Sequence, residues 1–137
     1  MFFKKEKNDN EDSDFIKVAA LLIHAARIDE NYTPKEKEII KQTLLKIGAD
    51  KKNIETIISK GKEIEENANQ ILDFTKEVKQ MNEEKKIEIV ECLWRIIYSN
   101  QDADIFETNL MRRLAGLLYI DNKTMGNIKS KIKNEIL

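Results

Sequence analysis

The sequence of 137 residues contains one cysteine, one histidine, one proline and four glycines. Cys92 has no second cysteine with which to form an internal disulfide, which fits a reducing compartment. His24 is the only histidine, which excludes zinc sites built from several Cys and His ligands and Ser-His-Asp catalysis. We find no nucleophile–base pair, phosphate-binding Gly loop or dinucleotide motif. We therefore expect no catalytic residues, no enzymatic activity and no organic cofactor.

A strong excess of one charge is also missing. The net charge is −1 although 36% of the residues are charged, whereas nucleic-acid binders normally show a basic excess. The longest apolar run, VAALLI, is much shorter than the roughly 20 residues of a membrane span. The first residues lack the apolar stretch of a signal peptide. We predict a cytoplasmic protein that binds no nucleic acid.

The length fits one domain, which at this size buries about two-thirds of its unfolded surface. Residues 1–12 are polar and charged except for the two phenylalanines, and we predict a disordered tail there. Residues 13–137 are predicted to form the single domain.

Helical periodicity fills this domain, because apolar residues recur at three- and four-residue steps and no segment alternates like a strand. The better-defined helices are predicted at about 14–28, 34–47, 51–66 and 83–98. Gly48 is a candidate C′ residue that ends the second of these. Three further segments start near Ile71, Leu110 and Met125. The fold class is therefore all-α, a bundle of about seven helices.

Two polar stretches, IDENYTPKE and SNQDADIFE, share one layout at a constant offset of 71 positions, the separation of Asp29 and Asn100. Each lies between two long apolar helices. The apolar pattern repeats with the same offset, as Ile40 with Met111 and Ile47 with Leu118 show. We infer two related helical hairpins, and a two-fold packing would place both polar stretches at one end of the bundle.

Helix capping explains these stretches in the simplest way. Thr33, Pro34 and Glu36 form a capping box in which Thr33 is the N-cap and Glu36 reaches back to its amide. Asp104 and Glu107 repeat the device in the second stretch. Each cap contributes about 1 kcal/mol. The remaining polar residues would then be ordinary turn residues.

Cation binding is the second interpretation, because the alternating oxygen donors are those that Ca²⁺ and Mg²⁺ prefer. The spacing is not that of an EF-hand, since Ile40 and Met111 occupy the position where a bidentate Glu is needed. If the two stretches meet, their carboxylates repel one another until a cation or a proton relieves the repulsion. A divalent cation (Ca, Mg or Mn) is the predicted cofactor. Its candidate ligands are Asp29, Asn31, Glu36, Asn100, Asp102, Asp104 and Glu107.

The segments AARIDENYTPKEKEII and LWRIIYSNQDADIFETNLMRRLAGLL resemble the two halves of the TerB-like, tellurite-resistance-associated family, and the resemblance covers about residues 15–136. It implies an all-helical domain with a divalent-cation or acidic-cluster site built from Asp29, Glu36, Asp102 and Glu107. It also implies a role in stress response, or as a sensor or docking module with a protein partner. Glu30 and Gln101 stand where the family usually has Gly, and Asn100 stands where it usually has Asp.

Other residues keep two interpretations each. His24 could approach the first polar stretch, or be a partly exposed helix residue. Arg112 and Arg113 could hold an anion or pair with the acidic stretches. The last helix carries lysines that either form a solvated face or contact an anionic partner or a membrane surface, namely Lys123, Lys129, Lys131 and Lys133. The oligomeric state does not follow from the sequence.

Overall fold

The computed structural model describes the backbone of residues 2–28, 32–68, 71–99 and 105–136. It also describes their side chains, except for those of 2–12, 105–108 and 136. The described chain is helical and contains no strand in these ranges. Its helices are α1 (Phe2–Ala26), α2 (Pro34–Lys46), α3 (Ile54–Asn67), α4 (Leu72–Lys79), α5 (Glu83–Ser99), α6 (Ile105–Leu117) and α7 (Asn122–Ile136). The prediction of an all-α bundle with about seven helices is confirmed.

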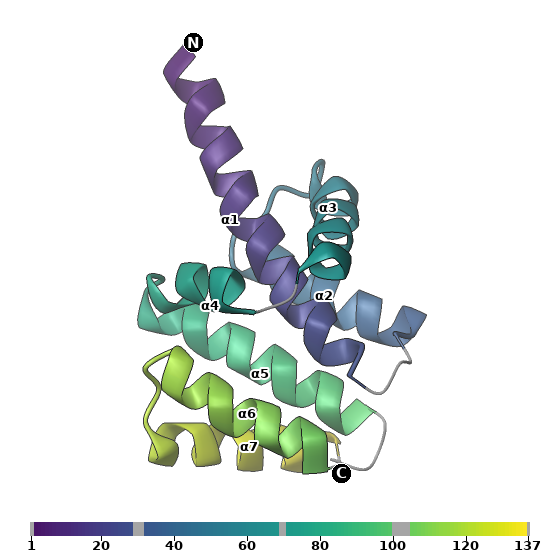
Figure 1. The fold of residues 1–137 in the computed structure, drawn as a ribbon, viewed down its shortest axis with the longest axis vertical. Coiled ribbons are helices and arrows are strands. Elements are labelled where there is room, and N and C mark those ends of the chain that lie inside the picture. The colour runs from purple at the N-terminus through teal and green to yellow at the C-terminus, as the bar shows by residue number, and fades with distance from the viewer. Residues whose placement is uncertain (1, 29–31, 69–70, 100–104, 137) are drawn as a thin grey trace.

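Helix α5 crosses the middle of the molecule, with α1 to α4 on one side and α6 and α7 on the other (Figure 1). Helix α1 packs chiefly against α3, and α5 packs chiefly against α7. Most of the largest fully buried side chains come from α1 and α5, among them Leu22, Leu93 and Ile97. The apolar periodicity of these two helices therefore forms the core that the rest of the chain covers.

Helix α1 begins at Phe2, whereas the sequence predicted a disordered tail over residues 1–12. Its first turns extend beyond the bundle (Figure 1). Residues 2–12 contain neither glycine nor proline, so a helix that is nucleated in the packed part of α1 can continue through them. The structure thus gives the backbone of residues 2–12 as part of α1, and the predicted disorder of this tail stays a prediction. The division of the chain into tail and domain stays a prediction.

Helix α2 has both ends where the sequence predicted them. Gly48 follows it with a φ of +119°, its N–H bonds Leu45 O at 3.2 Å, and the N–H of Ala49 bonds Leu44 O at 2.9 Å. This pattern is a Schellman motif, which favours glycine at C′ because a side chain is strained at positive φ. The third helix starts later than predicted, at Ile54, because the Asp50 carboxylate accepts the Lys52 N–H at 2.9 Å in the preceding turn.

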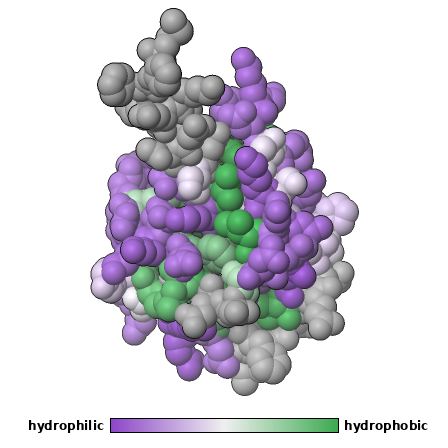
Figure 2. Space-filling view, turned by 45° about the horizontal axis from the view of Figure 1, so that its top comes forward, coloured by the Kyte–Doolittle hydropathy of each residue, from purple (hydrophilic) through white to green (hydrophobic). Residues whose placement is uncertain are grey.

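The repeat extends over three helices, since α1–α3 and α5–α7 follow one another at the same offset. Ile54, the first residue of α3, corresponds to Met125 in the first turn of α7. The short helix α4 connects the two halves. Hydrophilic residues cover most of the face in Figure 2, and hydrophobic residues reach the surface in a strip between them. None of the described helices is long and apolar enough to cross a membrane.

Candidate functional site

Among the seven predicted cation ligands, Glu36 has a described side chain. The other six lie outside the described side chains: Asp29, Asn31, Asn100, Asp102, Asp104 and Glu107. The backbone of Glu107 belongs to the first turn of α6. The site can therefore be built from Glu36 and from the described residues that border the two polar stretches.

Glu36 lies in the first turn of α2 and completes the predicted capping box. Its Oε1 accepts hydrogen bonds from the Thr33 N–H at 2.9 Å and the Thr33 hydroxyl at 3.0 Å. Thr33 Oγ1 in turn accepts the Glu36 N–H at 3.2 Å. Thr33 has the extended backbone of an N-cap, with φ −91° and ψ 159°. The first capping box is confirmed, while the second, at Asp104 and Glu107, lies outside the described side chains.

Burial distinguishes Glu36 from most capping glutamates, because the residue is only 1% exposed. Glutamate is almost never fully buried unless its charge is compensated. The same environment shifts the pKa of the neighbouring Tyr32. Burial, together with the negative charges of Glu36 and Glu55, raises the pKa of its hydroxyl to about 12. The start of α2 is thus shielded from solvent and negatively charged.

The chain segments that flank the two polar stretches come together. A cavity of about 500 Å³ is lined by Ile28, Asn109, Leu110 and Arg113. Ile28 directly precedes residues 29–31, and the other three lie in α6, which follows residues 100–104. The ends of α1 and α5 also lie on the same side of the molecule (Figure 1). The flanks thus agree with the predicted placement of both stretches at one end, although residues 29–31 and 100–104 lie outside the described residues.

The structure separates the two arginines that the sequence left undecided. Arg113 lines the cavity next to Ile28, at the side of the polar stretches. Arg112 lines a different cavity together with Trp94 and Lys129. These neighbouring residues therefore face different surroundings.

His24 contacts α3. Its Nδ1 lies 3.3 Å from Glu65 Oε1, and Arg27 Nη1 lies 2.7 Å from Glu65 Oε2. Glu65 therefore links His24 and Arg27 to α3. His24 is part-buried, which agrees with the interpretation as a partly exposed helix residue.

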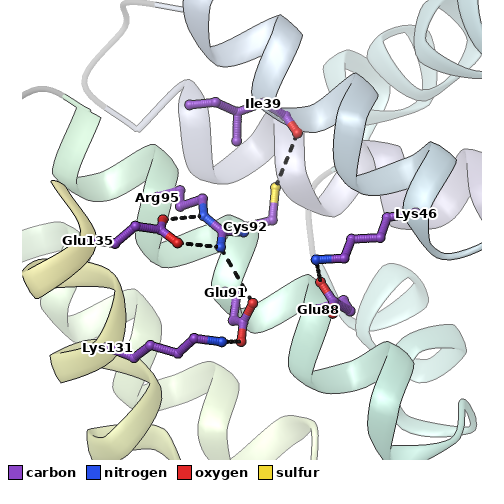
Figure 3. Close-up of polar contacts among 8 residues, drawn as sticks. All are labelled: Ile39, Lys46, Glu88, Glu91, Cys92, Arg95, Lys131 and Glu135. Atoms are coloured by element: carbon purple, nitrogen blue, oxygen red, sulfur yellow. Dashed lines mark hydrogen bonds and ion pairs between the residues drawn. The ribbon is translucent and has the colours of Figure 1, made fainter.

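A polar network between α5 and α7 was missed by the sequence analysis (Figure 3). Glu91, which is 5% exposed, accepts a hydrogen bond from Lys131 Nζ at 2.8 Å and lies 3.6 Å from Arg95 Nη2. Arg95 also donates two hydrogen bonds to Glu135, at 2.8 and 3.1 Å. This pairing lowers the pKa of the Glu135 carboxyl and raises that of Arg95. The four charges compensate one another, so the network stabilises the α5–α7 packing.

Cys92 lies next to this network in Figure 3, with Sγ 4.0 Å from Ile39 O. The thiol is fully buried, and burial raises its pKa to about 12. A thiol that stays protonated and inaccessible is a poor nucleophile. These features are those of an inert, structural cysteine.

Within the described ranges, no three His, Cys, Asp or Glu side chains gather closely enough to hold a metal ion. That search does not reach six of the seven predicted ligands.

Comparison with known proteins gives one match. The model of the family described as "Tellurite resistance protein TerB" matches residues 15–130. No curated protein and no solved structure matches the chain.

Proposed function

The chain belongs to the TerB family, and from this premise we propose that it is a non-catalytic domain that binds a divalent cation at its two acidic stretches. The predicted cation is Ca²⁺, Mg²⁺ or Mn²⁺. Residues 29–36 and 100–107 would provide carboxylate and amide oxygens, the ligands that these hard cations prefer.

The burial of Glu36 carries this proposal. A carboxylate that is 1% exposed loses the hydration that stabilises its charge, and a cation ligated nearby restores that stabilisation. The carboxylate also lies at the end of the molecule where the flanks of both stretches border one cavity. Glu36 therefore fits a ligand position in its burial, its chemistry and its place in the fold.

The other candidate ligands would complete the site: Asp29, Asn31, Asn100, Asp102, Asp104 and Glu107. Glu36 is held by Thr33 and is thus preorganised. A bound cation would supply positive charge, which allows the carboxylates of the two halves to lie close together. It would thereby join the start of α2 to the start of α6.

A metal-free scaffold that docks a protein partner is the alternative function. Two observations favour it. The capping box gives Glu36 a structural role without an ion. A cavity of about 540 Å³, lined by residues that include Ile39, Thr43 and Arg95, offers a partner a place to dock between α2 and α5.

The cellular role would be stress response or protein interaction, in line with the family's description as a tellurite resistance protein. The cytoplasmic location and the protein partner stay predictions. Nothing in the proposal requires tellurite itself to bind.

Thermal melting of Glu36→Gln separates the two functions. Glutamine also serves at N3 of a capping box, so this change keeps the cap and removes the charge. We expect EDTA-treated wild-type protein to gain about 2.7 kcal/mol at 100 times the dissociation constant of the cation. For a domain of this size the gain raises Tm by roughly 5–10 °C.

We expect Glu36→Gln to abolish this shift. Glu38→Gln is the matched control, because Glu38 is an exposed residue of the same helix that bonds Gln42. It should shift like the wild type. If millimolar Ca²⁺, Mg²⁺ and Mn²⁺ all leave the wild-type Tm unchanged, the metal-free alternative is correct.

A further inference from the structure

A second, smaller cavity lies among α5, α6 and α7. Its apolar wall is formed by Trp94, Met111 and Met125, which are all buried. Arg112, Asn122 and Lys129 supply its polar groups. This cavity is separate from Glu36 and from the cavity beside Ile28.

The charge of this cavity is positive. Arg112 and Lys129 both line it, and no acidic side chain of the described residues does. In the described part of the chain, neither cation forms an ion pair. By contrast Lys131, two residues further along α7, is paired with Glu91. The Lys129 ammonium instead lies over the Trp94 ring, 5.3 Å from its centroid, so one of the two cations is held directly above the indole.

Trp94 adds an unused hydrogen-bond donor. The residue is 3% exposed, and its indole N–H is buried without an acceptor among the described residues. Buried donors of this kind are rare in folded proteins and often indicate a water or ion that completes the site. The cavity is thus lined by a tryptophan whose indole N–H lacks an acceptor among the described residues, and by two cations that form no ion pair in that part of the chain.

The volume limits what can bind. The cavity measures about 170 Å³, whereas pockets for drug-sized ligands or nucleotides range from roughly 300 to 1,000 Å³. One water takes about 30 Å³ of liquid volume, so the space holds one small anion and a few waters. We propose that the cavity between Trp94, Arg112 and Lys129 binds a small oxyanion of the size of phosphate or sulfate.

Trp94 is the only tryptophan of the chain, so its fluorescence reports directly on this site. The probe is inorganic phosphate, titrated in EDTA at constant ionic strength with sodium chloride as the balancing salt. An anion that neutralises the charge above the indole changes the field on the ring, and therefore its emission. We expect a saturable change with phosphate and none with chloride alone.

Arg112→Ala and Arg113→Ala are the matched pair, because these neighbours on α6 line different cavities. Loss of a charge-assisted hydrogen bond should weaken phosphate binding at least about tenfold in Arg112→Ala. Arg113→Ala should bind within about twofold of the wild type, since exposed charges contribute little at a distance. Lys129→Gln provides a second test, and circular dichroism confirms that each variant is folded.

The inference is overturned if phosphate gives no saturable change, or if sodium chloride alone reproduces it. Equal weakening by Arg112→Ala and Arg113→Ala would also overturn it, because it would indicate diffuse attraction to the basic surface. None of these results depends on the divalent-cation proposal, since EDTA is present throughout.

Discussion

The two halves of the molecule end their second helices with the same backbone and different residues. After α2, Gly48 bonds Leu45 O and Ala49 bonds Leu44 O. After α6, Tyr119 bonds Gly116 O at 3.3 Å and Ile120 bonds Ala115 O at 3.0 Å, at positions 71 residues further along. The first half places glycine at the positive-φ position, whereas the second places Tyr119 there with φ +57°.

The surroundings of Gly48 and Tyr119 differ as well. In the first half, Phe15 lies 3.7 Å from where a Cβ of Gly48 would be. In the second half Lys86 stands at the position that corresponds to Phe15, and its buried ammonium donates a hydrogen bond to Leu118 O at 3.1 Å. The Lys79 ammonium lies 4.2 Å from the centroid of the Tyr119 ring. The fold therefore fixes the chain reversal, and polar contacts in the second half offset a strain that glycine avoids in the first.

The halves also differ where the third helix crosses the first. Gly61 of α3 lies so close to α1 that a Cβ would meet the Ala19 Cβ at 2.8 Å and backbone atoms of Ala20 and Ile16 at 3.1 Å. The equivalent residue of α7 is Ile132, which is fully buried. Close backbone approach thus holds one half together, and side-chain packing holds the other.

The largest predicted effect on stability comes from placing an isoleucine, as found at position 132, at the equivalent position 61 of the first half. Gly61→Ile places a branched side chain against backbone atoms that cannot move independently of α1. Overpacking a core costs about 1–3 kcal/mol, and we expect the upper end or more here. Urea unfolding measures the loss.

Gly116→Ala is the control for Gly61→Ile, because a Cβ at Gly116 meets nothing within 4 Å. Alanine in a helix should stabilise by up to about 1 kcal/mol. Equal stability of Gly61→Ile and the wild type would mean that the α1–α3 crossing is not tight.

A pH-dependent difference is predicted at Cys92, which stands where the first half has Leu21. Burial raises its pKa from 9.0 to about 12, so the unfolded chain ionises first. Its contribution is complete below pH 9 and is lost as the pH rises from about 9 towards 12. The loss is about 1.4 kcal/mol per pH unit above pH 9.

Unfolding at pH 8 and pH 10 in wild type and Cys92→Ala isolates this contribution. We expect the wild type to lose about 1.4 kcal/mol more than the variant between these pH values. A parallel decline of both proteins would show that the thiol is not buried in solution.

The smallest effect is predicted at Tyr119. Tyr119→Gly removes the strain of a side chain at positive φ, about 1–2 kcal/mol, and loses an exposed cation–π contact of about 0.5–1 kcal/mol. We expect a net gain of about 0.5–1 kcal/mol in the free energy of unfolding, measured by urea denaturation. Gly48→Ala, at the equivalent position, should instead destabilise. A loss of stability in Tyr119→Gly would contradict the comparison.

Sequence periodicity predicted the helices because each one buries an apolar face, and that face leaves its spacing in the sequence. The capping box at Thr33 and Glu36 and the C′ role of Gly48 were also predictable, since they depend on residues within a few positions of each other. Tyr119 was not predicted at positive φ, because tyrosine carries no such preference and only tertiary contacts hold it there.

Long-range contacts could not be predicted from the sequence either, because they too depend on the tertiary structure. The bonds from Arg95 to Glu135, and the approach of Gly61 to Ala19, join residues about 40 positions apart, and they depend on how helices cross. The repeat did predict that the polar stretches share one end of the bundle, and their flanks agree. Convergence of Asp29 with Asp102 stays a prediction, because both lie outside the described residues.

Direct titration of the cation tests the central claim, and the asymmetry of the two halves sharpens it. Calorimetry of EDTA-treated protein with Ca²⁺, Mg²⁺ and Mn²⁺ should reveal one saturable site per chain. Asp29→Asn should abolish binding, and Asn100→Asp should tighten it, because ligand charge tunes affinity for hard cations. No saturable heat with any of the three ions, or the same response in both variants, would contradict the account.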